Sequence, residues 1–187
     1  MSIRLSKKRI FTCLNNHALS VEEGLALNKQ QLQFNNYTPA GVIIPLIEHE
    51  TNYEVLFTER THNLKNHPGQ ISFPGGKAEE NDKNLLMTAL RETEEEVGLA
   101  LNLFNIIGSL EPLPSIAGFL VTPFIGILAP PCILKIDTQE VAATFTVPLN
   151  YLIDPANRRL QIISRNDQDY EVYVIEYENH RIWGLTA

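Results

Sequence analysis

The segment that decides the fold is residues 75–99, which read GGKAEENDKNLLMTALRETEEEVGL. In its second part, side chains that suit a buried stripe recur three and four positions apart, at Leu86, Leu90, Thr93 and Val97. This spacing predicts an amphipathic helix over residues 83–97. Gly98 follows directly, and a glycine commonly ends a helix at that position.

Three glutamates gather on one edge of this predicted helix. At about 100° per residue, Glu96 falls about 40° to one side of Glu92 and Glu95 about 60° to the other. Like charges at about 4 Å repel by roughly 4 kcal/mol at an effective dielectric constant of 20. A hard divalent cation, Mg²⁺ or Mn²⁺, would offset that repulsion. Charge runs also form ordinary solvated faces, and the run alone leaves both interpretations open.

Two further features of the segment favour a ligand site. Gly75 and Gly76 lie ahead of the helix, and paired glycines permit positive φ angles and a close approach of a ligand to the backbone. Arg91 precedes Glu95 by one helical turn, which places its guanidinium to hold that carboxylate in position. The segment therefore indicates a glycine loop that runs into an acidic helix.

The segment resembles the Nudix box, G-x5-E-x7-R-E-U-x-E-E-x-G-U, where U is a bulky apolar residue. Residues 91–99 match the second half except for Thr93 at the first U position. In the first half, Gly76 and Asp82 take the Gly and Glu positions if the loop before Arg91 is one residue longer.

This resemblance implies an α/β fold, a Nudix-type α/β/α sandwich with a mixed β-sheet packed between helices. It also implies metal-dependent hydrolysis of a nucleoside diphosphate linked to another group, with Mg²⁺ or Mn²⁺ as cofactor. The implied metal ligands are Glu92, Glu95 and Glu96. Arg91 is implied as a catalytic residue, with Glu95 as the helix-borne base. Glu140 is a second candidate base, because later loops supply a carboxylate in several Nudix enzymes; a surface glutamate ahead of a strand is the alternative.

A second resemblance lies upstream, in residues 56–76, LFTERTHNLKNHPGQISFPGG. They are similar to the signature of the coenzyme A pyrophosphatase branch, L-L-T-x-R-[SA]-x3-R-x3-G-x3-F-P-G-G. Phe57, Thr61 and Lys65 depart from it. Lys65 keeps the cation but loses the bidentate fork of an arginine. The implied reaction converts coenzyme A, or acyl-coenzyme A, to 3′,5′-ADP and 4′-phosphopantetheine or its acyl form.

The same stretch supplies the candidate substrate-binding residues. Cationic or ring side chains at Arg60, Lys65 and His67 lie close in sequence to the glycine loop, Gly75 and Gly76, and are candidate anion contacts. In the alternative interpretation Arg60 only pairs with an acidic neighbour and His67 caps a turn.

Two other functions are compatible with the box. One is a Nudix hydrolase of NADH, ADP-ribose or a damaged nucleotide. The other is a non-catalytic, nucleotide-sensing Nudix module; loss of the glutamates would signal it, and Glu92, Glu95 and Glu96 are all present.

Composition limits the partners. The chain has 187 residues and a net charge of −7, which argues against bulk nucleic-acid binding. Residues 77–96 hold seven acids and three bases, so they contribute −4 of that charge. The only cysteines, Cys13 and Cys132, are too few for a disulfide framework, so a reducing, cytoplasmic location is expected. We expect a small nucleotide as the partner.

No membrane segment and no second domain are expected. Residues 112–134 carry no charge, but their five prolines fit two short strands better than a spanning helix. We expect one domain over residues 1–187, with an N-terminal helical extension over residues 1–38. Strands are expected at residues 40–48, 53–59, 104–110, 119–128 and 144–148, and residues 60–82 as a long loop.

The C-terminal end predicts a hairpin of residues 160–164 with 170–177, which turns at Asn166 and Asp167. In the resembling family the Trp-Gly-Leu-Thr-Ala segment leads into a closing helix, and this chain stops at Ala187. We therefore expect an exposed apolar surface there that contacts a partner, a homodimer included.

Overall fold

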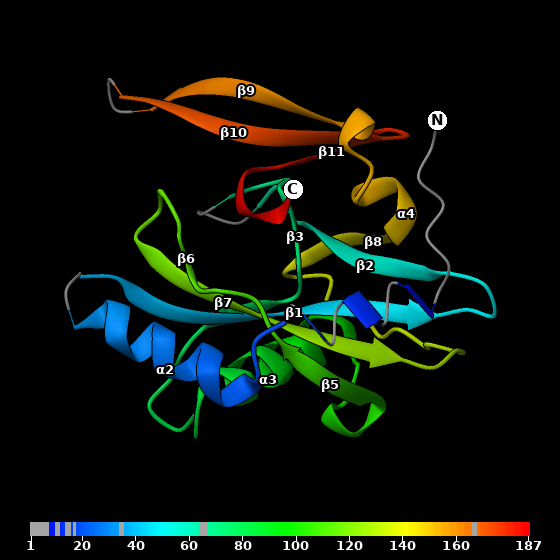
Figure 1. Cartoon of the computed structure of the whole chain (residues 1–187), viewed down its shortest axis with the longest axis horizontal. Coiled ribbons are helices and arrows are strands. Elements are labelled where there is room, and N and C mark those ends of the chain that lie inside the picture. The colour runs from blue at the N-terminus through cyan, green and yellow to red at the C-terminus, as the bar shows by residue number, and fades with distance from the viewer. Residues whose placement is uncertain are drawn as a thin grey trace.

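The computed structural model describes residues 8–9, 12–13, 16, 18–33, 36–63, 67–165 and 168–187. Within them the main sheet (Figure 1) consists of β1 (Thr38–Glu48), β2 (Tyr53–Arg60), β3 (Ile71–Ser72), β4 (Gly75–Lys77), β5 (Phe104–Ser109), β6 (Leu113–Pro114), β7 (Phe119–Leu128) and β8 (Val141–Pro148). A second sheet consists of β9 (Arg158–Arg165), β10 (Gln168–Tyr177) and β11 (His180–Trp183). The helices are α2 (Val21–Leu32), α3 (Leu85–Val97) and α4 (Leu149–Leu152), with 3₁₀ turns η1 (Leu101–Leu103), η2 (Pro155–Asn157) and η3 (Gly184–Thr186).

The main sheet is mixed, as expected from the sequence. Its central strands β1 and β7 run parallel over ten residue pairs, and the other strand pairs among the described residues are antiparallel. The order β3-β2-β1-β7-β5 places β1 next to several elements at once. The mixed α/β fold predicted from the sequence is confirmed.

The strands β1 and β2 separate along their length, and the glycine segment fills the space between them. β1 pairs with β2 only at residues 46–48, whereas residues 40–42 pair with β4. Between these two regions, Ile43 N donates to Pro74 O at 2.9 Å. The predicted long loop over residues 60–82 therefore contains two short strands, and β4 is part of the sheet.

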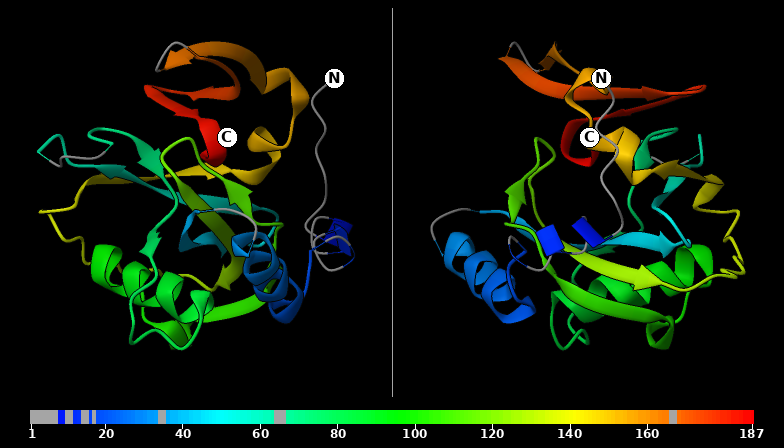
Figure 2. Two further views of the ribbon diagram at one scale, coloured as in Figure 1. Left: turned by 90° about the vertical axis from the view of Figure 1, so that its left-hand side faces the viewer. Right: turned by 45° about the vertical axis from the view of Figure 1, so that its right-hand side comes forward.

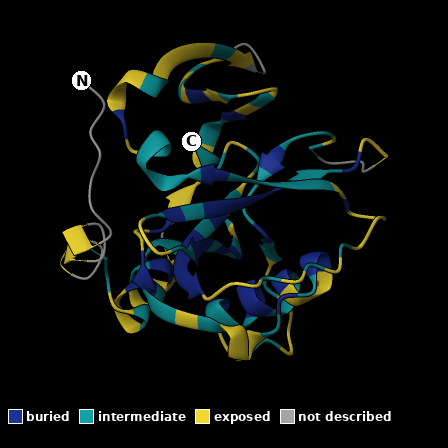
Figure 3. Cartoon of the chain, turned by 90° about the vertical axis from the view of Figure 1, so that its right-hand side faces the viewer, coloured by how far each residue is buried: buried dark blue, intermediate teal, exposed yellow. Residues whose placement is uncertain are grey.

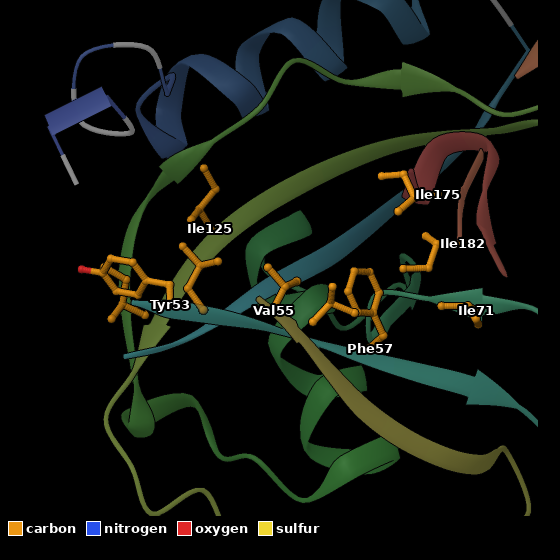
Figure 4. Close-up of a cluster of buried hydrophobic side chains, with 10 residues drawn as sticks. Tyr53, Val55, Phe57, Ile71, Ile125, Ile175 and Ile182 are labelled. Carbon is orange, nitrogen blue, oxygen red and sulfur yellow. The ribbon is translucent and has the colours of Figure 1, made fainter. Parts of the chain in front are cut away.

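The two faces of the main sheet are covered differently (Figure 2). α3 packs on one face, where Ile43, Leu90 and Phe124 form a buried cluster that α2 borders. The other face packs against the second sheet, through a cluster that includes Phe57 and Ile175 (Figure 4). The resemblance implies helices on both faces of the main sheet. In the described residues, the face opposite α3 is covered mostly by the second sheet, together with the short α4.

A row of stacked rings runs from the main sheet to the second sheet. Phe73, Phe57, Phe145 and His180 follow one another with centroid separations of 5.1, 5.5 and 3.7 Å. Phe73 directly precedes the Pro-Gly-Gly segment, and His180 opens β11. The rings therefore connect the glycine segment to the C-terminal sheet.

The helix ends follow local sequence signals. α3 begins after Asn84, whose side chain accepts from Met87 N at 3.0 Å, and ends at Gly98 in the left-handed region, with φ 73°. The predicted helix over residues 83–97 and its glycine cap are confirmed. α2 begins with a capping box between Ser20 and Glu23.

Three other expectations have mixed outcomes. The predicted N-terminal helical region is partly outside the described residues, which show α2 from Val21. The C-terminal hairpin is present, although its turn at Asn166 and Asp167 lies outside the described residues, and β11 adds a strand that was not predicted. No helix in the described residues is both long enough and apolar enough to span a membrane.

Helix α2 is seated on the sheet at a glycine, which gives a first testable prediction. A Cβ atom on Gly24 would lie 2.0 Å from Ser109 Oγ and 2.9 Å from Ser109 Cβ. We expect Gly24→Ala to lower the free energy of unfolding by about 1–3 kcal/mol, although alanine is intrinsically favoured in helices. Urea unfolding measures this. Adding Ser109→Ala removes the nearer atom and should recover part of the loss; equal stability of wild type and Gly24→Ala would contradict the packing.

Candidate active site

The acidic edge of α3 meets the glycine loop, and its three glutamates differ in exposure. Glu96 is 3% exposed, and the side chains of Glu92 and Glu95 are 18% and 60% exposed. The structure therefore keeps Glu92 and Glu96 inside the fold and leaves Glu95 at its rim. This order follows the helix, because the predicted buried stripe borders Glu96.

Backbone of the glycine loop lies directly on the two inner carboxylates. Gly75 N donates to Glu96 Oε2 at 3.3 Å. A Cβ atom on Gly76 would lie 2.5 Å from the carboxyl carbon of Glu92. Gly75 has φ 145°, and a Cβ atom there would lie 2.4 Å from Gly41 O. Both positions thus require glycine: Gly75 because a side chain would collide with the backbone of β1, and Gly76 because a side chain would displace the Glu92 carboxylate.

Arg60 reaches the Glu96 carboxylate from the end of β2. The pairing of β2 with β8 shifts register between Glu59 and Arg60, and such a bulge redirects the side chains that follow it. Arg60 Nη1 lies 3.6 Å from Glu96 Oε1. The sequence alternative that Arg60 pairs with an acid therefore holds, and the acid is Glu96 of the box itself.

Glu140 enters the cluster on a loop tied to α3. Asp137 N donates to Glu96 O at 3.0 Å, and Glu140 O accepts from Thr61 N at 2.9 Å. The Glu140 side chain is exposed, and its charge adds to the raised pKa of both Glu92 and Glu96. Glu140 is thus a surface glutamate directly ahead of β8, as one interpretation has it, and its role as a base stays a prediction.

Thr61 is a residue whose part in the site was not predicted. Its Oγ1 donates to Gln139 O at 3.0 Å, and its amide holds Glu140 O, so it fixes the Glu140 loop twice. The sequence offered little signal for this role, because the signature also allows serine, which carries the same hydroxyl.

The cluster holds more negative charge than its surroundings compensate. Burial raises the pKa of Glu96 to about 8, with Glu92 and Glu140 adding to the rise and Arg60 and Gly75 N opposing it. Burial also raises the pKa of Glu92, which Arg91 opposes. Oxygen donors under mutual repulsion suit a hard divalent cation. In the described part of the chain, however, no three Asp, Glu, His or Cys side chains form a complete metal-binding group.

Arg91 organises the outer side of the cluster. It donates to Asp82 through Nε and Nη2, both at 3.1 Å, while its Nη1 lies 3.0 Å from Glu92 Oε1 and from Glu95 Oε2. Thr88 Oγ1 also donates to Asp82, at 2.9 Å. The extra loop residue therefore does not prevent Asp82 from anchoring Arg91.

Thr93, the departure from the box, causes no buried polar defect. Its side chain is fully buried, and Oγ1 donates to Ala89 O at 2.6 Å within the helix. A hydroxyl satisfied in this way can replace a bulky apolar side chain on the inner face of α3.

Two other residues predicted to contact the substrate, His67 and Lys65, are not seen beside the glutamates in the described structure. His67 Nδ1 lies 2.7 Å from Gln70 Oε1, and Gln70 N donates to His67 O at 3.3 Å, so His67 is engaged in its own turn, as the alternative interpretation has it. Lys65 lies outside the described residues.

The Asp82–Arg91 pair gives a pH-dependent prediction. Hydrogen bonds from Arg91 are the largest cause that lowers the pKa of Asp82, from 3.8 to about 2. A lowered folded-state pKa means that the pair stabilises the fold above about pH 4, and that this contribution, at most about 2 kcal/mol, is lost as pH falls towards 2. We expect Asp82→Asn to be less stable than wild type by that amount at pH 7, with the gap closing below pH 4.

Urea unfolding between pH 7 and pH 3 measures this gap. Glu80→Gln, at an exposed acid of the same loop, is the matched control and should not show it. A gap that stays constant with pH would mean that Asp82 stabilises the loop by its shape and not by its charge.

Known proteins resemble this chain in sequence and in fold. Residues 37–160 match the NUDIX domain family. An uncharacterized Nudix hydrolase, NudL, of Photorhabdus laumondii is 39% identical over 169 residues, which covers 86% of this chain and 90% of the relative. The NudL of Enterobacter sp. is 38% identical over 152 residues, covering 81% and 79%.

Solved structures share the fold at low identity. A C. elegans Ap4A hydrolase binary complex superimposes with a TM-score of 0.50 at 18% identity, covering 57% of this chain and 77% of that one. The M. smegmatis Nudix hydrolase RenU gives a TM-score of 0.50 at 19% identity, covering 60% and 71%. The NUDIX domain family matches more than half of the chain, and a relative is 39% identical to it, so the family is established. This chain belongs to the Nudix hydrolases, enzymes of nucleoside diphosphate derivatives that generally use divalent metal cations.

Proposed function

We propose that this Nudix hydrolase cleaves the diphosphate of coenzyme A or acyl-coenzyme A, releasing 3′,5′-ADP and 4′-phosphopantetheine or its acyl form. The observation that carries the proposal is the 3.6 Å contact between Arg60 and Glu96. It joins the two signatures in space, because Arg60 belongs to the one that resembles coenzyme A pyrophosphatases and Glu96 to the Nudix box.

We assign the metal, Mg²⁺ or Mn²⁺, to Glu92, Glu95 and Glu96. When bound, the cation supplies charge neutralisation for the diphosphate and a more acidic water. Glu92 and Glu96 fit this role because they are inner oxygen donors whose pKa values are raised by burial and mutual repulsion. Glu95 is exposed beside Arg91, within reach of solvent and substrate.

The other residues bind, orient and move a proton. Arg60 offers its guanidinium to phosphate oxygens, and the backbone of Gly75 and Gly76 is proposed to line the diphosphate site. Arg91, held by Asp82, fixes Glu92 and Glu95. Glu95 or Glu140 accepts the proton of the attacking water as general base. Lys65 and His67 are proposed as further anion contacts.

Comparing coenzyme A with dephospho-coenzyme A tests the substrate assignment. The purified protein with Mg²⁺ or Mn²⁺ should release 3′,5′-ADP from coenzyme A, identified by chromatography. If a cationic pocket holds the 3′-phosphate, removing that phosphate should lower kcat/KM by roughly 10- to 100-fold, as expected for one or two charge-assisted hydrogen bonds. Equal kcat/KM for both compounds would remove the case for that pocket.

The same assay separates the competing functions. NADH, ADP-ribose and oxidised nucleotides form the comparison panel, and the highest kcat/KM identifies the substrate class. A nucleotide-sensing module would bind one of these compounds without turnover at any divalent metal. The retained Glu92, Glu95 and Glu96 favour a working hydrolase over such a module.

A further inference from the structure

The C-terminal hairpin carries an exposed apolar stripe. β11 pairs only with residues 174–177 of β10, so β9 and the rest of β10 project beyond it (Figure 1). On this projecting part, which Figure 3 shows largely exposed, Leu160, Ile162 and Tyr173 are 53%, 60% and 48% exposed. Leu160 and Tyr173 are paired, and they share a face with Ile175, which packs into the core. The stripe thus continues the core face into solvent.

The stripe borders an open strand edge. In the described part of the chain β9 pairs with β10 alone, so alternate N–H and C=O groups along its other side have no strand to bond. Long apolar edge strands are normally covered by another element or chain. We propose that β9 pairs antiparallel with β9 of a second copy of this chain, about a two-fold axis at Gln161, to form a continuous six-stranded sheet.

The register follows from the apolar side chains. Residues opposite each other in an antiparallel pair point to the same face. With Gln161 opposite Gln161 of the second copy, Leu160 faces Ile162 of the second copy and Ile162 faces its Leu160. Two rows then cross the interface, and each has Leu160 beside Ile162 of the other copy, with Tyr173 at the Leu160 end and Glu171 at the Ile162 end. A two-fold interface requires this kind of self-complementarity.

The charges agree with the same register. Arg158 falls opposite Ser164 of the second copy, and the Ser164 hydroxyl hydrogen-bonds to Asp169 on the next strand. Each guanidinium thus faces a row that ends in a carboxylate, twice by symmetry. Arg158 and Asp169 of the second copy thus lie in one cross-strand row with Ser164 between them, and this complementarity of charge favours the register.

The neighbouring registers are worse. With Leu160 on the axis, Arg158 would fall opposite Ile162 and bring a guanidinium into the apolar row. With Ile162 on the axis, Leu160 would fall opposite Ser164 and lose its apolar partner. Of these three registers, the one at Gln161 pairs both exposed apolar residues of β9 with apolar residues and keeps Arg158 out of the apolar pairs.

The first test is the oligomeric state. Sedimentation velocity on the full chain at about 1–200 µM should show a monomer–dimer equilibrium. Ile162→Lys should raise the dissociation constant at least tenfold, and Leu103→Lys, at a residue 51% exposed outside the hairpin, should not change it. Because Ile162 is exposed, circular dichroism should show a folded variant.

The second test fixes the register. With Cys13 and Cys132 replaced by serine, Gln161→Cys should form a disulfide dimer on mild oxidation. Ile163→Cys should not, because residue 163 would face Arg159 and lie far from its own copy. A protein that is monomeric throughout, a dimer that survives Ile162→Lys, or equal crosslinking at both positions would each overturn the proposal. A substrate group or another protein that occupies the stripe would give the monomeric outcome.

Discussion

Replacing Glu96 by glutamine should abolish hydrolysis, lowering kcat/KM by about 1,000-fold or more while the protein stays folded. Glutamine keeps the shape and an oxygen that can accept from Gly75 N. It removes the charge that the cation and Arg60 require, in a buried site where a fixed charge has its largest effect. Glu95→Gln should also lower the rate strongly, because Glu95 is both a proposed ligand and a candidate base.

Glu94→Gln is the matched control, since Glu94 belongs to the same run of glutamates, is exposed and lies near 200° from Glu92 around the helix. It should retain wild-type kcat/KM. Circular dichroism and thermal unfolding should show Glu96→Gln at least as stable as wild type in metal-free buffer, because a buried, repelled carboxylate has been neutralised. Near wild-type turnover by Glu96→Gln would refute the assignment of the site.

Adding a methyl group to the glycine loop should have the next largest effect, with different results at its two positions. In Gly76→Ala the new Cβ would lie 2.5 Å from the carboxyl carbon of Glu92, the mobile end of a side chain. We expect kcat/KM to fall about 100-fold with a small change in stability, because Glu92 is displaced. In Gly75→Ala the Cβ meets backbone, Gly41 O at 2.4 Å, and φ is 145°.

For Gly75→Ala we therefore expect a loss of about 3 kcal/mol or more in the free energy of unfolding, with low yield of folded protein. Gly118→Ala controls for positive φ alone, since Gly118 has φ 86° and no atom within 4 Å of a new Cβ. It should cost about 1 kcal/mol and leave activity unchanged. If Gly76→Ala loses stability rather than activity, the Glu92 contact is structural only.

The sequence predicted the elements whose signals are local and repeated. α3 carries an uninterrupted spacing of buried positions and a glycine cap, so its course was predicted within two residues. The acidic edge follows from helical geometry alone. Asp82 was placed by motif position across a loop of unusual length, and its bond to Arg91 agrees with that placement.

The rest depends on contacts that no local pattern encodes. β3 and β4 are two and three residues long, too short for alternation, and they exist because β1 and β2 separate and leave unpaired backbone between them. Glu140 had two interpretations because its position rests on Asp137 and Thr61, which are distant in sequence from one another.

The pairing of β4 with β1 has a consequence for recognition. Residues 75–77 are a strand of the main sheet, and Pro74 O accepts a hydrogen bond from Ile43 N. This backbone is therefore ordered as soon as the protein folds. If the proposed function is correct, a diphosphate at Gly75 and Gly76 would meet a preformed surface, and its binding would carry no entropic penalty for ordering this backbone. We therefore expect this part of the site to select ligands by their fit to a backbone that does not rearrange on binding.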